Sequence, residues 1–254
     1  MTEPVILTIE NAVARVTLNR PEKRNALNAA VISGLKTALV TSAQNDTVRC
    51  VVINGAGSDF CSGADLESLR KISEASVEEN LADARSLLDL FLLIRQTQIP
   101  VLAAVHGRAL AGGCGLASAC DLVLASSTAR FGYPEVKIGF VPAMVLAILR
   151  RSVSEKRAFE LLTLGKEFGA AEGKELGLVN AVFPDKEFAT EVTKYAQAFS
   201  QVSRSAVALT KGLLYGVDGM SLSEALDMGA DVNVIARMSD DCKSGVARFL
   251  NRSS

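Results

Sequence analysis

The first half of the chain contains short apolar segments whose pattern is typical of β-strands. Residues 5–9 and 13–18 alternate between apolar and polar side chains, which predicts two half-buried strands. Continuous apolar runs at 50–54, 101–105 and 122–125 predict shorter strands that are buried on both faces. The segments between these runs are long enough to hold helices, so the pattern does not indicate an all-β protein.

Apolar residues recur at helical spacing between these strands and through the second half of the chain. Residues 27–41 and 81–94 each predict an amphipathic helix. Alternating strands and helices followed by a helical tail predict the α/β fold class. No low-complexity linker interrupts the chain, so we expect a core domain over 1–195 continuous with a helical region over 196–254. The later predicted helices are 143–150, 155–163, 170–176, 186–200, 206–215, 222–236 and 240–250, with one short strand at 178–182.

Composition and charge exclude several classes of protein. The chain has 254 residues, of which 49% are hydrophobic and 22% charged, as in an ordinary globular protein. A formal net charge of -1 gives no general attraction to nucleic acid or to an anionic membrane. The first residues lack the pattern of a secretory signal, and no apolar run is long enough to span a bilayer. We therefore expect neither a nucleic-acid partner nor a membrane association.

Cysteine and histidine usage narrows the chemistry further. The chain has 5 cysteines without C-x-x-C spacing, which favours reduced thiols and a cytoplasmic location. Its only histidine, His106, follows a predicted strand, and we expect a structural imidazole rather than a metal ligand or proton carrier. We expect no metal site. The sequence also lacks G-x-S-x-G, a complete P-loop motif and a G-x-G-x-x-G after a strand, which argues against hydrolase, P-loop and dinucleotide-dependent oxidoreductase functions.

Two glycine-containing loops each follow a buried strand. They read "CSGADL" at 61–66 and "ALAGGCG" at 109–115. Strand ends in α/β proteins are where ligands and catalytic groups collect. Glycine allows a sharp turn and a close approach to the backbone, so each loop can present a free N–H group. Two such donors aimed at one oxygen form an oxyanion hole. From these residues alone, tight packing of a helix against a strand is an equally good explanation of the glycines.

Five longer motifs occur in a characteristic order: "LNRPEKRNALN", "DFCSGADL", "AAVHGRALAGGCGLASACDLVLA", "FGYPEVKIGFVP" and "LGLVNAVF". This order resembles the crotonase superfamily, also called the enoyl-CoA hydratase/isomerase family, over essentially the whole chain. The resemblance implies a crotonase-like spiral of ββα units with a C-terminal helical trimerisation region, assembled as a homotrimer or a dimer of trimers. It implies an acyl-CoA thioester whose oxygen is held by the N–H groups of Ala64 and Gly112. No separate cofactor is expected, because coenzyme A is part of the substrate.

Members of this family that add water to a double bond typically use two glutamates, and this chain matches only one. Glu135, in "GYPEVKIG", matches the second, whereas Gly115, in "AGGCGLA", replaces the first. Two carboxylates suit water addition, and one suits a proton shuttle that moves a double bond between C3–C4 and C2–C3. Gly115 thus favours Δ3-Δ2 isomerisation with Glu135 as acid and base. The alternatives are a 2-enoyl-CoA hydratase and a non-catalytic acyl-CoA-binding protein. Asp121, in "ACDLVLA", is expected to order the local backbone.

The resemblance also assigns residues to the two ends of the substrate. Phe249 and Arg252, in "RFLNR", match an aromatic and a basic residue that close over CoA, often from a neighbouring subunit, although the usual basic tail is shorter here. Segment 66–95 is expected to form part of the acyl pocket, together with Phe140 and Met144. The residues expected along the rest of the CoA moiety are Arg24, Ala26, Asp65 and Leu66.

Overall fold

A six-stranded sheet forms the centre of the structure, a computed structural model that describes residues 3–252 with every side chain in this range except those of Leu66 and Arg252. The strand order is β1-β2-β3-β4-β6-β9. The first two strands form an antiparallel hairpin, and every later neighbour pairs in parallel. The strands are β1 (Val5–Glu10), β2 (Val13–Leu18), β3 (Cys50–Gly55), β4 (Val101–Val105), β6 (Leu122–Ser126) and β9 (Ala181–Phe183).

A second sheet of three short strands completes the ββα turns. Its order is β5-β7-β8, and a bridge from Cys61 to Ala109 extends it toward the first glycine loop. The chain runs from β4 through β5 into α4, and from β6 through β7 into η2 and α5. Each turn thus consists of one strand from the larger sheet, one strand from the smaller sheet and then a helix, which confirms the expected spiral. The bounds are β5 (Arg108–Leu110), β7 (Arg130–Gly132), β8 (Glu167–Gly169), α4 (Gly112–Ala119), η2 (Pro134–Ile138) and α5 (Ala143–Leu149).

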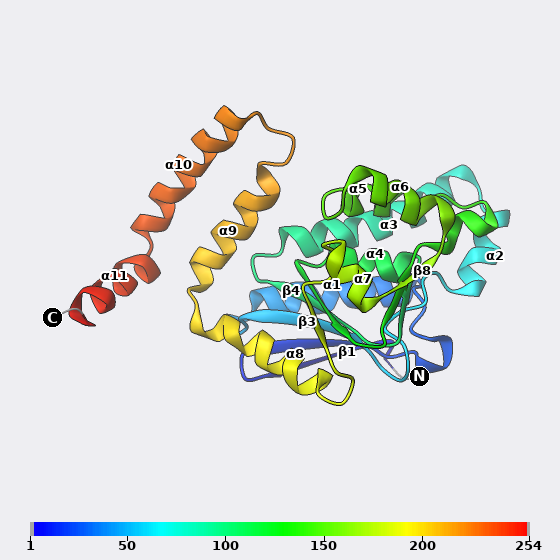
Figure 1. The fold of residues 1–254 in the computed structure, drawn as a ribbon, viewed down its shortest axis with the longest axis horizontal. Helices are drawn as coiled ribbons and strands as arrows, with labels where there is room; N and C mark the ends of the chain where they lie inside the picture. The colour runs from blue at the N-terminus through cyan, green and yellow to red at the C-terminus, as the bar shows by residue number, and fades with distance from the viewer. Residues whose placement is uncertain (1–2, 253–254) are drawn as a thin grey trace.

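Helices cover both faces of the larger sheet (Figure 1). Val51 and Ile53 of β3 belong to the main core cluster, whereas Cys50 and Val52 pack in a second cluster with Phe188. This alternation follows from the pleat of a strand, and burial on both faces explains why the central strands are apolar throughout. The helices of the main cluster include α1 (Ala29–Gln44) and α3 (Val77–Gln96), and the second cluster lies under α8 (Phe188–Gln197).

The remaining core elements correct two details of the predicted pattern. A helix at Leu66–Glu74 (α2) was not expected from the apolar periodicity, and the last core strand covers 181–183 rather than 178–182. Within residues 3–252, no helix is both long and apolar enough to cross a membrane. The other helices are η1 (Pro21–Lys23), α6 (Glu155–Leu164), α7 (Ala170–Glu175) and η3 (Ala198–Gln201).

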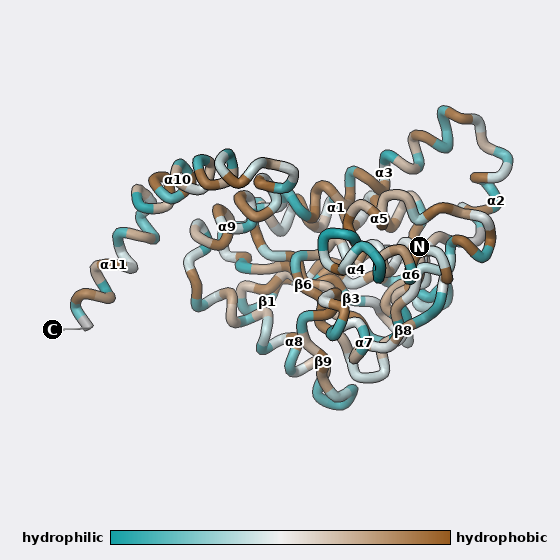
Figure 2. Tube along the Cα trace, turned by 45° about the horizontal axis from the view of Figure 1, so that its top comes forward, coloured by the Kyte–Doolittle hydropathy of each residue, from teal (hydrophilic) through white to brown (hydrophobic). Residues whose placement is uncertain are grey.

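Three C-terminal helices extend away from the core: α9 (Arg204–Gly216), α10 (Leu222–Met238) and α11 (Asp240–Arg252). In Figure 1 they lie at the end of the molecule opposite α2, and α11 lies farthest from the sheets. Figure 2, which colours the chain by hydropathy, shows apolar residues recurring along these three helices. In the single chain, exposed large apolar side chains on α10 and α11 are Leu222, Leu226, Val234, Ile235, Met238, Val246, Phe249 and Leu250.

A buried polar cluster anchors α9 to the core. Lys211 Nζ donates hydrogen bonds to Asp121 Oδ2 at 2.7 Å and to the carbonyls of Ile94 at 2.8 Å and Ile99 at 3.1 Å. Tyr215 Oη donates to Asp121 Oδ1 at 2.8 Å, and the Val101 N–H donates to Asp121 Oδ2 at 2.7 Å. Asp121 therefore orders the backbone at the start of β4, as expected, and it also holds the C-terminal region.

Candidate functional site

The first glycine loop leaves the amide of Ala64 free. The Leu27 N–H donates to the Gly63 carbonyl at 2.7 Å, and the Asp65 N–H donates to the Leu27 carbonyl at 2.9 Å. These two bonds form a parallel bridge between Leu27 and Ala64, in which the residues flanking Ala64 make the contacts. The N–H of Ala64 itself points to the opposite side. In the described part of the chain it has no hydrogen-bond acceptor.

Among the described residues, the second glycine loop leaves the amide of Gly112 without a hydrogen-bond acceptor. Gly112 is the first residue of α4, and the first N–H groups of a helix have no partner within the helix. Ala111 immediately before it has φ 49 and ψ -128, a left-handed conformation that costs about 1–3 kcal/mol for a residue with a side chain. Its N–H donates to the Gly132 carbonyl at 2.8 Å, which fixes this turn against β7.

The two loops are in direct contact. Gly63 has φ +95, and a Cβ placed on it would lie 2.8 Å from Ala111 Cβ and 3.4 Å from Gly112 N. The residue before Ala64 is thus packed against the N-terminus of α4. The structure therefore brings the loops of Ala64 and Gly112 into contact, and the positive end of α4 would attract a negatively charged oxygen bound there.

The three glycines of α4 have different surroundings. A Cβ on Gly112 would meet only Leu27 Cδ1 at 3.5 Å, an ordinary contact. A Cβ on Gly113 would lie 2.3 Å from the Cys61 carbonyl oxygen, and one on Gly115 would lie 2.6 Å from Val145 Cγ2. Tight packing therefore explains Gly113 and Gly115, whereas it does not by itself require glycine at position 112.

Glu135 carries an unpaired carboxylate oxygen. It lies in η2, directly after β7, and its residue is half-buried. Its Oε2 is buried and has no hydrogen-bond partner among the described residues. Burial raises the pKa of this carboxyl above its ordinary value, and a backbone hydrogen bond offsets the rise only in part. A carboxyl of this kind is suited to accept a proton and to hold it for a further step.

Tyr133 links the element that carries Glu135 to the helix that begins at Gly112. Its side chain is fully buried, and its hydroxyl lies 2.9 Å from Ser118 Oγ. Ser118 Oγ donates to the Cys114 carbonyl at 2.7 Å, so the Tyr133 hydroxyl donates to Ser118. Burial raises the pKa of Tyr133 well above its ordinary value, which keeps the hydroxyl protonated. No sequence pattern links Ser118 with Tyr133, because both are ordinary residues for a packed interior.

The residues expected along CoA form one connected loop region beside Ala64. The Arg24 carbonyl accepts from Ser62 N–H at 3.0 Å, and the Ala26 carbonyl accepts from Arg20 Nη1 at 2.9 Å. Asp65 pairs with Arg20 at 2.7 Å and caps α2 through the Glu67 N–H at 2.9 Å. Burial alone would raise the pKa of Asp65, but these hydrogen bonds outweigh it and lower the pKa. The Asp65 side chain is thus occupied within the protein.

Asn25 is a loop residue that the sequence analysis did not identify. It has φ 56, its side chain is buried, and its Oδ1 accepts from the Arg20 N–H at 3.0 Å. Its Nδ2 donates to the carbonyls of Ala56 at 2.8 Å and Asp59 at 2.7 Å. Asparagine tolerates the left-handed conformation, and here its amide fixes the loop to the strand end that leads to Ala64.

The other expected substrate contacts are distributed between two places. Phe140 lies just after η2 and is 45% exposed, and Met144 lies in the first turn of α5 and is partly buried against the core. Phe249 and Arg252 lie on α11. Within one chain, α11 lies at the end of the molecule opposite α2 (Figure 1). The side chains of Leu66 and Arg252 lie outside the described residues. A single chain therefore does not bring Phe249 and Arg252 to Ala64 and Gly112.

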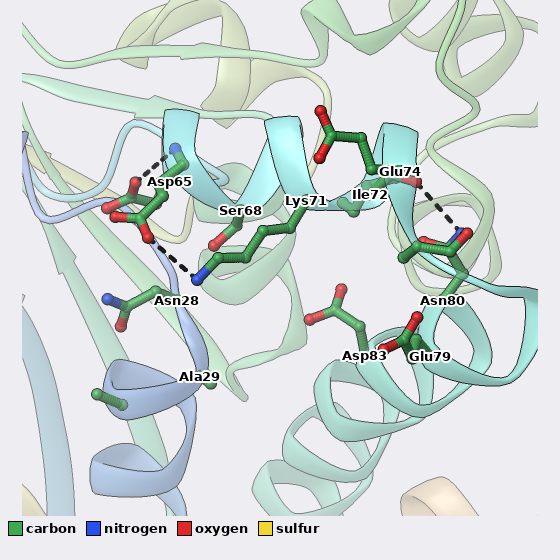
Figure 3. Close-up of a pocket in the computed structure, with 13 residues that line it drawn as sticks. Asn28, Ala29, Asp65, Ser68, Lys71, Ile72, Glu74, Glu79, Asn80 and Asp83 are labelled. Carbon is green, nitrogen blue, oxygen red and sulfur yellow. Dashed lines mark hydrogen bonds and ion pairs between the residues drawn. The ribbon is translucent and has the colours of Figure 1, made fainter.

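A polar groove of about 650 Å³ begins beside Asp65 and runs between α1, α2 and α3 (Figure 3). Lys71 from α2 and Asp83 from α3 lie on its facing sides, and Lys71 Nζ pairs with Glu67 at 3.0 Å. The charged lining makes this part of segment 66–95 unsuited to an apolar acyl chain. The charged residues of the groove are Asp65, Glu67, Lys71, Glu74, Glu79 and Asp83.

Comparison with known proteins identifies the family. The model of the enoyl-CoA hydratase/isomerase family matches residues 8–254, so the chain belongs to this family and to the crotonase superfamily. A Thermus thermophilus protein named "Putative enoyl-CoA hydratase" is 41% identical over 240 residues, covering 94% of this chain and 95% of that protein.

Two solved structures agree with this assignment. The crystal structure of an enoyl-CoA hydratase from Mycobacterium smegmatis matches with a TM-score of 0.93 and 33% identity, covering 98% of this chain and 96% of that one. A structure from Legionella pneumophila, described as "putative enoyl CoA hydratase/isomerase (crotonase)", matches with a TM-score of 0.91 and 32% identity, covering 99% of this chain and 98% of that one. The chain is therefore an enzyme of the enoyl-CoA hydratase/isomerase family, whose members are lyases and isomerases.

Proposed function

We propose that this enzyme moves the double bond of an enoyl-CoA thioester between C3–C4 and C2–C3. Glu135 removes a proton from C2, the electrons delocalise onto the thioester oxygen, and the same carboxyl returns the proton to C4. The N–H groups of Ala64 and Gly112 stabilise the negative charge on that oxygen. No atom is gained or lost, so the reaction needs no cofactor and no metal.

The presence of one unpaired carboxylate carries this proposal. Glu135 Oε2 has no partner among the described residues, and burial raises the pKa of the group. The raised pKa of Glu135 lies closer to the pH at which an enzyme works than the pKa of an ordinary glutamate does, so that the carboxyl can hold a proton between the two steps. Position 115 holds a glycine packed against Val145, so no second carboxylate stands there.

Hydration of a 2-enoyl-CoA is the second candidate. The names of the relatives favour it, because the Thermus thermophilus and Mycobacterium smegmatis proteins are both described as enoyl-CoA hydratases. Water addition would require Glu135 alone to activate water and to supply the proton to C2.

Isotope incorporation separates the two reactions. The purified enzyme is given trans-2- and trans-3-enoyl-CoA in ¹⁸O-labelled water, and the products are followed by mass spectrometry. Interconversion of the two isomers without ¹⁸O uptake is the expected result. Formation of ¹⁸O-labelled hydroxyacyl-CoA as the main product would refute isomerisation and support hydration.

The same proposal extends to assembly and location. We propose a homotrimer or a dimer of trimers in which α11 of one subunit brings Phe249 and Arg252 to the CoA site of another. The exposed apolar side chains of α10 and α11 support association, because such a surface is costly to leave in water. A cytoplasmic location is supported by the free thiols of Cys50, Cys61, Cys114, Cys120 and Cys242.

A further inference from the structure

Two buried apolar side chains fill the space that a side chain at position 115 would need. A Cβ on Gly115 would lie 2.6 Å from Val145 Cγ2 and 3.3 Å from Phe91 Cζ. Val145 is 5% exposed and Phe91 4%, so neither can move into solvent. Val145 is β-branched and lies in α5, where one rotamer is strongly preferred. Even a methyl group at position 115 therefore requires Val145, or the helix that carries it, to shift.

Position 115 is close to the candidate oxyanion hole. It follows Gly112 by three residues on α4, and residues at this spacing lie on the same face of a helix. Phe91 comes from α3 and Val145 from α5, so three helices meet at this point. Any side chain introduced at position 115 would have to pass between Phe91 and Val145.

The carboxylates of the neighbouring loops have partners of their own. Asp65 is held by Arg20, and Asp59 Oδ1 accepts from the Arg108 N–H at 3.0 Å. Glu167 lies between the guanidinium groups of Arg108, at 3.9 Å, and Arg130, at 3.8 Å. None of these three is a ready substitute for a second catalytic carboxylate.

We propose that Val145 and Phe91 determine the reaction specificity of the site. They form an apolar wall that excludes a second carboxylate, together with the water that such a carboxylate would hold. The restriction to one carboxylate then comes from α3 and α5, and not from the residue at position 115 alone. The catalytic meaning of the wall rests on the proposed isomerase function, whereas the steric exclusion itself does not depend on which reaction occurs.

A thermal double-mutant cycle tests the exclusion without any assay of activity. Gly115→Ala should lower Tm by roughly 3–10 °C, because overpacking a core typically costs about 1–3 kcal/mol. In a Val145→Ala background the same substitution should lower Tm only slightly or should raise it, because alanine has a higher helix propensity than glycine. An equal change of Tm in both backgrounds would overturn the proposed wall.

An activity experiment tests the effect on specificity. Gly115→Glu, Gly115→Glu/Val145→Ala and the carboxylate-free control Gly115→Gln/Val145→Ala are given trans-2-enoyl-CoA in ¹⁸O-labelled water. We expect the Glu/Ala variant to hydrate at least tenfold faster than both others. Equal hydration by Gly115→Glu alone, or by the Gln control, would overturn the proposal. Hydration by the unmodified enzyme would instead refute the proposed isomerase function, and the thermal cycle would still decide whether the wall exists.

Discussion

The two ends of helix α4 differ in how their polar groups are paired. At its N-terminus no group in the described part of the chain accepts a hydrogen bond from the Gly112 N–H, and the turn there is bonded to β7, the strand that leads to Glu135, whose buried Oε2 has no partner among the described residues. Beyond its C-terminus, Asp121 accepts hydrogen bonds from Lys211 and Tyr215 side chains and from a backbone amide. The same short helix therefore separates an unsatisfied polar site from a fully paired one.

This difference indicates which end is built for chemistry. An unpaired buried polar group costs roughly 1–3 kcal/mol, and the left-handed Ala111 adds a cost at the same end. A ligand that accepts hydrogen bonds from the free amides and gives a proton to Glu135 would recover that free energy. The Asp121 cluster has no such need, and its role is to hold α9 and the helices that follow.

Removing the unpaired carboxylate should have the largest effect. Glu135→Gln should lower kcat for isomerisation by about 10²–10⁴-fold, because the amide cannot accept the proton. Acyl-CoA binding, measured by calorimetry, should remain. Glu167→Gln is the matched control, because Glu167 is paired with arginines and should change kcat little. Full turnover by Glu135→Gln would exclude Glu135 as the proton carrier.

Removing the paired carboxylate should instead affect stability. Asp121→Ala leaves Lys211 buried without its counter-ion, and the free energy of unfolding should fall by about 3–5 kcal/mol. Denaturant unfolding measures this loss. The control is Asp46→Ala, which breaks the exposed ion pair between Asp46 and Arg204. Arg204 lies on α9, as Lys211 does, and this variant should change the free energy of unfolding by at most about 1 kcal/mol. Equal losses in the two variants would contradict the anchoring role of the cluster.

Removing one amide donor tests the oxyanion hole. Gly112→Pro lacks the N–H, and kcat should fall by about 10²–10³-fold. The comparison variant Gly112→Ala keeps the N–H, and its Cβ meets only Leu27 at an ordinary distance. Circular dichroism confirms that both variants fold before their rates are compared. A folded proline variant that is as active as the alanine variant would rule out the Gly112 amide as a donor.

The pH dependence gives the smallest and most specific effect. Because burial raises the folded-state pKa of Glu135, the acid limb of kcat/KM should lie above the pKa of an ordinary glutamate, about 4.3. Folding then favours the protonated form, so the contribution of Glu135 to stability is present below the unfolded pKa and is lost as pH rises through the folded pKa. Glu135→Gln should remove this part of the stability profile. An unchanged profile in the variant would contradict the raised pKa.

Most secondary structure could be predicted because it follows from local periodicity. The alternating residues of 5–9 and the apolar run of 101–105 became strands, as predicted. Helix α2 escaped detection because its sequence, "LESLRKISE", is dominated by polar residues, and its start is marked only by the capping side chain of Asp65. The strands β5, β7 and β8 have three residues each, too few to show a period.

The candidate site was predictable only where its residues share a motif. Ala64, Gly112 and Glu135 lie in motifs that resemble the family, and the structure places the first two loops in contact. The partners of Asp121 lie 90 and 94 residues away on α9, so no local pattern links them. The contact of Gly115 with Val145 and Phe91 likewise depends on how three helices pack, which sequence spacing does not encode.

The most direct test of the central claim follows one hydrogen atom. A 3-enoyl-CoA deuterated at C2 is converted in a single turnover by an excess of enzyme, and the 2-enoyl-CoA product is examined by mass spectrometry for deuterium at C4. Because the proposed shuttle uses one carboxyl, that of Glu135, both to remove and to return the proton, we expect part of the deuterium to appear at C4. Product that carries only solvent hydrogen at C4, at every time within that turnover, would contradict a shuttle by Glu135 alone.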